Sequence, residues 1–252
     1  MKHDTFRTDL FAGQTILVVG GTTGIGAAIA GAFAALGAAV TVSGATRSEC
    51  AAARKNPDFS CRDAVPLDVR DEASAQALLA NFPRLDVLVN CAGIIRRNDE
   101  HEIAVFEEVL AINLTGTMRM CTLAREKLKA APGKDGGSIV NTASVLSYLG
   151  GGRVPGYSAS KGGVAQLTKS LAIAYADEGI RVNAIAPGWV ATSLTQTLQQ
   201  DPERSDAIVR RTPLRRWGQP DDIAGAAVFL CSPAARFVTG AVLPVDGGYL
   251  AY

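Results

Sequence analysis

The sequence predicts a single α/β domain, doubly wound around a parallel sheet of seven strands. Short apolar runs of strand length alternate with helix-length stretches along the whole chain, and no linker rich in Pro, Gly or Ser divides it. Continuous apolar runs are typical of strands buried on both faces of a parallel sheet, and strand-helix alternation is typical of that architecture. At 252 residues, with 48% hydrophobic residues, the chain is long enough for one large domain of this class.

The first strand is predicted at 16–19, and glycines follow it directly. An alanine-rich helix then runs to Leu36. Strand, glycine turn and helix in this order place backbone N–H groups where a pyrophosphate could bind, as in a Rossmann-type domain. The spacing Gly20-x3-Gly24-x-Gly26 differs from the G-x-G-x-x-G fingerprint, but its context still predicts dinucleotide binding.

The second strand, 39–43, bears on the choice of cofactor. An acidic residue at its end would hold the ribose 2'-hydroxyl of NAD, whereas an arginine would accept the 2'-phosphate of NADP. Here the strand leads into Gly44-Ala45-Thr46-Arg47, with no carboxylate at the tip. The pattern therefore mildly favours NADP over NAD. Two alternatives stay open, because Arg47 could simply begin a solvated helix and Glu49 could take the acidic role.

The later elements continue the alternation. They are predicted as strand 64–69, helix 73–82, strand 86–89, a long helical stretch 102–129, strand 137–142, helix 156–176, strand 180–186, helix 221–230 and strand 241–245. Asp68 is placed where it could bind an adenine amino group, although a helix N-cap is an alternative for Asp68 or Asp71. Asn90, Ala92 and Gly93 follow the fourth strand, and small residues there let a cofactor approach the backbone.

The chain thus divides by role rather than by domain. We assign 12–150 mainly to the cofactor, and the arginine-rich segment 189–218 to a mobile lid over the substrate. Candidate residues Asn90, Ser144, Tyr157 and Pro187 fall at or after the carboxyl ends of strands. Ligands bind at those ends in folds of this class.

Tyr157 and Lys161 carry the predicted chemistry. Residues four apart share one face of a helix, so a phenol and an ammonium lie side by side. A neighbouring cation favours the phenolate and is expected to lower the tyrosine pKa, which would let Tyr157 exchange a proton with a carbinol or carbonyl oxygen. The alternative is an exposed pair with no function.

Asn113, inside the long helical stretch, is interpreted as a kink or a water anchor, although a surface position is the commoner use of such a residue.

Charge and cysteine content narrow the function classes. With 25 basic and 24 acidic side chains the net charge is +1, which gives no footprint for nucleic acid or a membrane surface. We therefore expect a small-molecule substrate. Five scattered cysteines without a C-x-x-C pair, and a polar start without an apolar leader, predict a cytoplasmic protein. No metal site is assigned, because His3 and His101 have no partners at ligand spacing.

Taken together, these motifs resemble the short-chain dehydrogenase/reductase family over essentially the full length. The matching residues are Gly20, Gly24, Gly26, Asp68, Asn90-Cys91-Ala92-Gly93, Asn113, Ser144, Tyr157-x3-Lys161, Pro187-Gly188 with Thr192, and Asp246-Gly247-Gly248. The resemblance implies a catalytic set of Asn113, Ser144, Tyr157 and Lys161, and it implies that Thr23, Ile25, Val69, Val190 and Thr192 join the cofactor contacts. In that scheme Ser144 binds the substrate oxygen, Lys161 also holds the nicotinamide ribose, and Asn113 anchors a water. Val19 and Cys91 depart from the family's usual threonine and asparagine.

Within the family, the segments 93–97, 153–155, 191–196 and 216–218 look like the sugar-acid branch. Arginines at the mouth of the site, Arg96 and Arg153 in particular, could hold a carboxylate with paired hydrogen bonds. Arg96 and Arg97 could instead lie on the surface between subunits. The alternative functions are a 3-oxoacyl carrier-protein reductase and, as the weakest, a cofactor-binding regulator without turnover.

The resemblance also implies a homotetramer. The small residues Ser160, Gly162, Gly163 and Ala165 would let two such helices approach closely.

Overall fold

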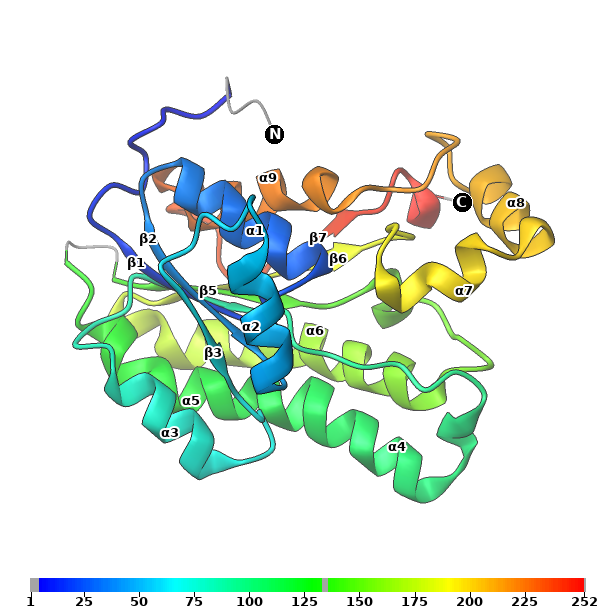
Figure 1. Cartoon of the computed structure of the whole chain (residues 1–252), viewed down its shortest axis with the longest axis horizontal. Coiled ribbons are helices and arrows are strands. Elements are labelled where there is room, and N and C mark those ends of the chain that lie inside the picture. Colours follow the sequence, from blue (N-terminus) through cyan, green and yellow to red (C-terminus); the bar gives the residue numbers. More distant parts are fainter. Residues whose placement is uncertain (1–4, 133–135, 252) are drawn as a thin grey trace.

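The computed structural model describes residues 5–132 and 136–251, so residues 1–4 of the expected polar N-terminal arm, and His3 with them, lie outside the described residues. Its centre is a seven-stranded parallel sheet in the order β3-β2-β1-β4-β5-β6-β7 (Figure 1). The strands are β1 Thr15–Val19, β2 Ala39–Gly44, β3 Asp63–Pro66, β4 Val87–Asn90, β5 Ser138–Thr142, β6 Arg181–Pro187 and β7 Val242–Val245. The predicted fold class and strand number are confirmed. The third strand is shorter than expected and ends at Pro66, before Asp68.

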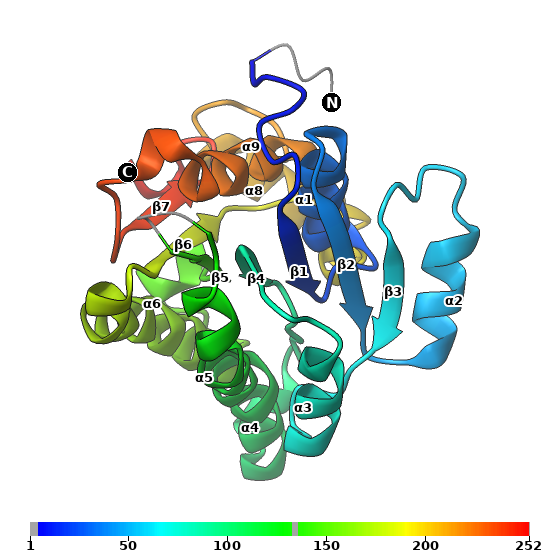
Figure 2. The ribbon, with the colours of Figure 1, turned by 90° about the vertical axis from the view of Figure 1, so that its left-hand side faces the viewer.

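Helices cover both faces of the sheet (Figure 2). They are α1 Gly24–Ala35, α2 Arg47–Lys55, α3 Glu72–Ala80, α4 Ile103–Leu110, α5 Gly116–Lys129, α6 Pro155–Tyr175, α7 Gln196–Gln199, α8 Pro202–Arg211 and α9 Pro220–Cys231. Alternate residues of β1 point to opposite faces, so Ile16 and Val18 pack with α1 and α9 while Leu17 and Val19 pack with α3, α5 and α6. Burial on both faces explains why the strands read as unbroken apolar runs.

The long helical stretch predicted at 102–129 is interrupted as its asparagine suggested. Between α4 and α5 the chain forms a π-helical turn, Ala111–Thr115. Asn113 lies in that turn and is fully buried, so the surface alternative is wrong. Such a turn is frequent at functional sites, because it turns a side chain away from the regular helix surface.

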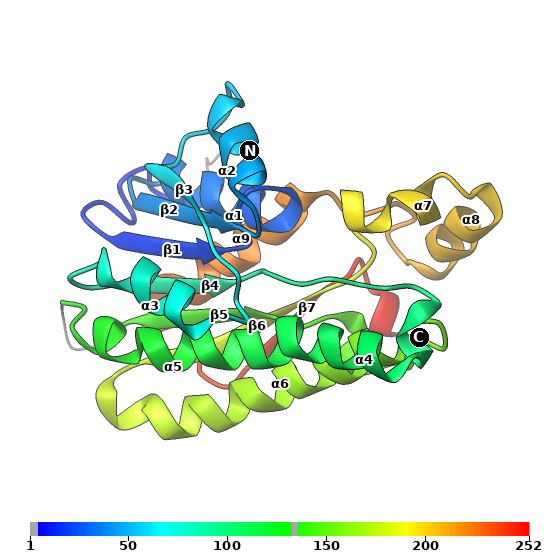
Figure 3. The same ribbon diagram turned by 60° about the horizontal axis from the view of Figure 1, so that its bottom comes forward.

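The segment 189–218 carries α7 and α8, which project from one end of the molecule (Figure 3). Asp201 caps α8 by accepting the N–H of Arg204, and Pro202 stands at the first helical position. The segment returns to the body through Trp217, whose indole donates to Ser205 at 2.9 Å. The segment predicted as a lid therefore contains two α-helices, and its mobility stays a prediction.

The structure also bears on the cysteines, on membrane-spanning helices and on the small residues of α6. All five cysteines lie in the described residues and are free thiols. Of the helices in the part of the chain that the structure describes, none combines the length and apolar character needed to cross a membrane. Two of the small residues expected at a helix-helix contact face their own chain instead: Ser160 is fully buried, and a Cβ on Gly163 would lie 2.7 Å from Leu114.

Candidate active site

A cleft of about 650 Å³ opens at the carboxyl ends of the central strands. Its floor is the glycine turn after β1. Gly20 has φ +77°, and a Cβ there would lie 2.5 Å from the Ala92 backbone nitrogen, so only glycine fits. A Cβ on Gly26 would collide with the Gly20 carbonyl oxygen. This bare backbone cradle at the start of α1 is suited to the diphosphate of a dinucleotide.

Most residues predicted from the sequence line this cleft. They are Gly20, Thr23, Gly24, Ile25, Gly26, Asp68, Val69, Ala92, Gly93, Ser144, Tyr157, Lys161, Pro187, Gly188, Val190 and Thr192. Of the predicted catalytic and cofactor residues, three lie elsewhere. Arg47 is the exposed first residue of α2, Asn113 is fully buried behind the cleft, and Asn90 is buried with its amide donating to Asn141 at 2.9 Å.

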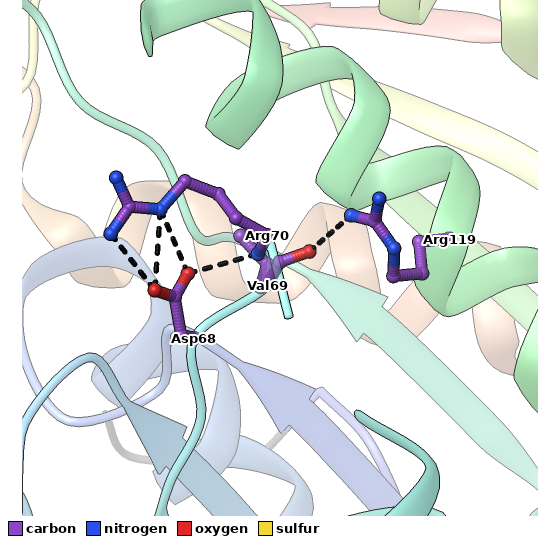
Figure 4. A network of polar contacts seen from close by, with 4 residues as sticks. All are labelled: Asp68, Val69, Arg70 and Arg119. Carbon is purple, nitrogen blue, oxygen red and sulfur yellow. Dashed lines mark hydrogen bonds and ion pairs between the residues drawn. The ribbon is translucent and has the colours of Figure 1, made fainter. Parts of the chain in front are cut away.

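The far end of the cleft, where β2 and β3 finish, holds Asp68 in an ion pair. Arg70 reaches both Asp68 oxygens at 2.8 to 3.2 Å, and Arg119 fixes the loop by donating to the Val69 carbonyl at 2.6 Å (Figure 4). Arg70 holds the pKa of Asp68 below its usual value. The N-cap of α3 is Asp71, not Asp68. Arg70, which no sequence motif singles out, therefore lines the cleft with its guanidinium paired to Asp68.

Glu49 also lines this end, but its carboxylate is engaged locally. It accepts the Ala45 N–H at 2.8 Å and the Thr46 N–H at 3.4 Å, and Thr46 accepts the Glu49 N–H in return. This capping box starts α2. Both of the bonds that the carboxylate accepts reach Oε2, so Oε1 makes no hydrogen bond to a described residue, and the alternative role of Glu49 as the holder of a ribose hydroxyl stays open.

Tyr157, Lys161 and Ser144 meet at the opposite end of the cleft. Lys161 is 4% exposed, donates to the Thr142 carbonyl at 2.6 Å, and places its ammonium 5.5 Å from the centre of the Tyr157 ring. Ser144 lies just beyond β5, is 7% exposed, and hydrogen-bonds to Tyr157. The predicted side-by-side pair of phenol and ammonium is therefore present and faces the glycine-lined cleft.

The electrostatics of the pair differ from the sequence expectation. Burial raises the pKa of Tyr157 above its ordinary value, against the opposing effects of the Ser144 hydrogen bond and of Arg97. Burial also lowers the pKa of Lys161 to about 8. Lys161 is not among the groups that shift the Tyr157 pKa, and desolvation of the phenol is the largest effect on it. The expected lowering of the tyrosine pKa by Lys161 stays a prediction.

Asn113 fastens the wall of the cleft to the tyrosine helix. Its side chain accepts the Ile94 N–H at 2.8 Å, donates to the Ile94 carbonyl at 2.9 Å, and donates to Ser160 at 3.1 Å. Ser160 in turn donates to the Tyr157 carbonyl at 2.7 Å. The π-helical turn aims this amide inward, so Asn113 acts on the position of Tyr157, and its predicted role as a water anchor stays a prediction.

A second cavity of about 390 Å³ adjoins Tyr157 and Ser144 beneath the lid. Four arginines from three separate segments line it: Arg97, Arg153, Arg204 and Arg211. No Asp or Glu of the described chain is among its lining residues. Burial lowers the pKa of Arg97, and the nearby cations Arg204 and Arg153 lower it further. The cavity is therefore strongly cationic beside the candidate acid/base.

Three of these guanidinium groups are available to a ligand. Arg97, Arg153 and Arg204 make no side-chain hydrogen bond or ion pair with any residue that the structure describes, whereas Arg211 lies over the Tyr249 ring at 4.3 Å. Arg96, the predicted carboxylate ligand, is exposed and lies 3.6 Å from Glu108 instead. The turn that begins here leaves Arg96 outside the cavity and places Arg97 in its lining.

Several site residues escape prediction from the sequence, for identifiable reasons. Trp189 and Tyr249 line the cavity, and their rings meet edge to face at 6.2 Å, but their contact joins segments far apart in the chain. Arg204 and Arg211 lie on one helix, seven residues apart, a spacing that puts both on the same face. That spacing is a usable signal for the lid. Glu100 gives no signal, because nothing in its neighbourhood indicates that it is buried.

Comparison with known proteins agrees with this geometry. The family described as Enoyl-(Acyl carrier protein) reductase matches residues 19–250. The 2-dehydro-3-deoxy-D-gluconate 5-dehydrogenase of Bacillus subtilis is 42% identical, with 98% of each chain covered. The D-threitol dehydrogenase of Mycolicibacterium smegmatis is 40% identical over 97% of this chain and 94% of that one. A solved structure from Beutenbergia cavernae, a candidate NAD(P)-dependent gluconate 5-dehydrogenase with bound NADP at low occupancy, is 39% identical with TM-score 0.87, covering 97% of this chain and all (100%) of that one.

Proposed function

This chain belongs to the short-chain dehydrogenase/reductase family, and on that premise we propose that it interconverts a secondary alcohol and a ketone on a sugar acid, using NAD(P). The relatives named above are dehydrogenases of sugar acids or polyols. The observation that selects the acid is the cavity beside Tyr157, in which Arg97, Arg153 and Arg204 form no ion pair or side-chain hydrogen bond with a described residue. Guanidinium groups bind carboxylates through paired, charge-assisted hydrogen bonds.

The chemistry follows from three side chains. Tyr157 exchanges the proton of the substrate oxygen, and Ser144 would turn its single hydroxyl proton from Tyr157 to donate a hydrogen bond to the same oxygen. The bound nicotinamide would supply or accept the hydride. The Lys161 ammonium lies over the Tyr157 ring and donates to the Thr142 carbonyl, and because Lys161 lines the cleft, its remaining N–H groups would bind a ribose hydroxyl. The glycine cradle and Thr192 would hold the rest of the cofactor.

The raised pKa of Tyr157 gives the reaction a pH dependence. At neutral pH the phenol is protonated, which suits it to donate a proton during ketone reduction. Alcohol oxidation needs the phenolate, so its rate should increase as the pH rises toward the tyrosine pKa. Reduction should decrease over the same range.

We propose NADP as the preferred cofactor. Arg70 lines the cleft, and its guanidinium, which pairs with Asp68, would meet the 2'-phosphate there. The NADP in the Beutenbergia cavernae relative supports the same choice. A homotetramer remains our proposal for the assembly.

The test of the function is a substrate screen. Purified protein is assayed at the reduced-nicotinamide absorbance band with aldonates, 2-keto-3-deoxyaldonates, neutral polyols of the same length and 3-oxoacyl thioesters, each with both cofactors. We expect the highest kcat/KM with a sugar acid. Higher activity with a neutral polyol would refute the role of the arginines, and activity confined to the thioester would establish the carrier-protein reductase instead.

A further inference from the structure

Glu100 is a buried carboxylate that the proposed chemistry does not use. It lies in the short 3-10 turn Asp99–His101, and only 1% of its surface is exposed. Carboxylates are rarely buried to this degree unless something pairs with them, because desolvating the charge is costly. The partners of Glu100 are therefore informative about its role.

Both carboxylate oxygens accept backbone hydrogen bonds, from two different segments. Oε1 accepts the N–H of Arg96 at 2.8 Å, and Oε2 accepts the N–H of Tyr157 at 2.7 Å. The first bond fixes the loop that carries Arg97 into the cavity. The second caps the start of α6 at the candidate acid/base itself, where the free N–H groups and the helix dipole favour a negative charge.

Neighbouring bonds reinforce the same junction. Asn98, at φ +73°, donates its N–H to the Arg153 carbonyl at 2.9 Å, and His101 bonds to the Gly152 carbonyl at 3.0 Å. The turn 96–101 is thus joined to 152–157 along its length. Both segments contribute arginines to the cavity, and the second also contributes the phenol.

We infer that Glu100 is a positioning residue, which holds the Tyr157 phenol in register with the arginine that receives the substrate's acidic group. The inference rests on the proposed function. A one-ångström displacement of a reacting group can cost about a hundredfold in rate, so a single carboxylate shared by both segments is a direct means of controlling the geometry.

The charges around the phenol give a readout that a purely structural role would not change. Glu100 raises the pKa of Tyr157, whereas Arg97, from the same turn, lowers it, and Glu100 also raises the pKa of Arg97. Lys161 lies on the same helix as Tyr157, and Arg153 and Arg204 act on Arg97. Removing the Glu100 charge should therefore lower the tyrosine pKa. The acid limb of the pH profile, where the rate of alcohol oxidation rises with pH, should therefore move to lower pH.

The experiment compares Glu100→Gln, Glu100→Asp and the control Glu102→Gln in the full-length protein. Glu102 is two residues away, is exposed, and makes no side-chain hydrogen bond to a described residue. For Glu100→Gln we expect kcat/KM to fall roughly 10- to 100-fold, the acid limb to shift to lower pH, and NADPH binding to stay unchanged. Glu100→Asp keeps the charge, so its rate should fall without a shift of the limb.

Two results would overturn the inference. One is a Glu100→Gln enzyme that matches Glu102→Gln in kcat/KM and pH profile. The other is a loss of activity accompanied by an equal loss of NADPH affinity and an unmoved pH limb, which would reduce Glu100 to a fold-stabilising residue. A wild-type protein without dehydrogenase activity would instead refute the proposed function, so the two failures are distinguishable.

Discussion

The cofactor cleft and the substrate cavity are lined by different kinds of groups. The floor of the cofactor cleft is backbone and glycine, where a Cβ would not fit, and the charged residues in its lining are of both signs. The substrate cavity is made of long cationic side chains, Arg97, Arg153, Arg204 and Arg211, drawn from three segments. Backbone recognition suits a ligand that is the same throughout a family, whereas side chains can change without altering the fold. Tyr157 lies at the junction and serves both.

The largest effect should come at that junction. Tyr157→Phe removes the group that exchanges the proton, so kcat should fall roughly a thousandfold, with little change in NADPH affinity. Steady-state kinetics and a fluorescence titration of NADPH measure the two quantities. Tyr148→Phe is the matched control, since Tyr148 is 52% exposed and lines neither cavity. Equal activity of both variants would remove Tyr157 from the mechanism.

The backbone character of the cofactor half is tested at Gly26. In Gly26→Ala the new methyl group meets the Gly20 carbonyl, so we expect NADPH binding to weaken about tenfold or more and unfolding to become easier by about 1 to 3 kcal/mol. Gly31→Ala, on the same helix with open space around it, should raise stability by about 0.5 to 1 kcal/mol. Calorimetry and titration check both. Equal NADPH affinity and equal stability of the two variants would contradict the role of Gly26 in the cofactor cradle.

Burial of the Lys161 ammonium in the site is expected to lower the free energy of unfolding. Burial lowers its pKa from 10.5 to about 8, so the folded protein binds fewer protons than the unfolded chain between these pH values. At neutral pH the buried charge therefore costs free energy, and Lys161→Met should unfold about 1 to 3 kcal/mol less readily than the wild type, yet be inactive. The difference should shrink from pH 8 to 10.5. Chemical denaturation across that range measures it, and a less stable Lys161→Met at neutral pH would contradict the prediction.

The smallest effect concerns the choice of cofactor. Arg70→Ala should weaken NADPH binding roughly two- to fivefold more than NADH binding, because Arg70 lines the cleft and partly exposed charges contribute little. Arg47 lies outside the cleft, so Arg47→Ala should leave the ratio of the two affinities unchanged. Paired titrations decide between them. A larger shift for Arg47→Ala would restore the sequence-based assignment.

The contrast also explains what the sequence can predict. Glycine turns, apolar strands and a Tyr-x-x-x-Lys helix are local patterns, so the seven strands, the cradle and the pair of Tyr157 and Lys161 are all predictable from the amino-acid sequence alone. The arginine cavity depends on which way neighbouring side chains point, and the sequence therefore favours Arg96 where the fold places Arg97. The raised tyrosine pKa escapes prediction for a similar reason, because burial of the phenol has no local signature.

The most direct test of the account is the preference for a negative charge on the substrate. kcat/KM is measured for a sugar acid and for its uncharged amide, in the wild type, in Arg97→Met and in the surface control Arg96→Met. We predict that the wild type and Arg96→Met prefer the acid by about tenfold or more, and that Arg97→Met largely loses this preference. Equal activity on acid and amide in the wild type, or an undiminished preference in Arg97→Met, would contradict carboxylate recognition by the arginine cavity.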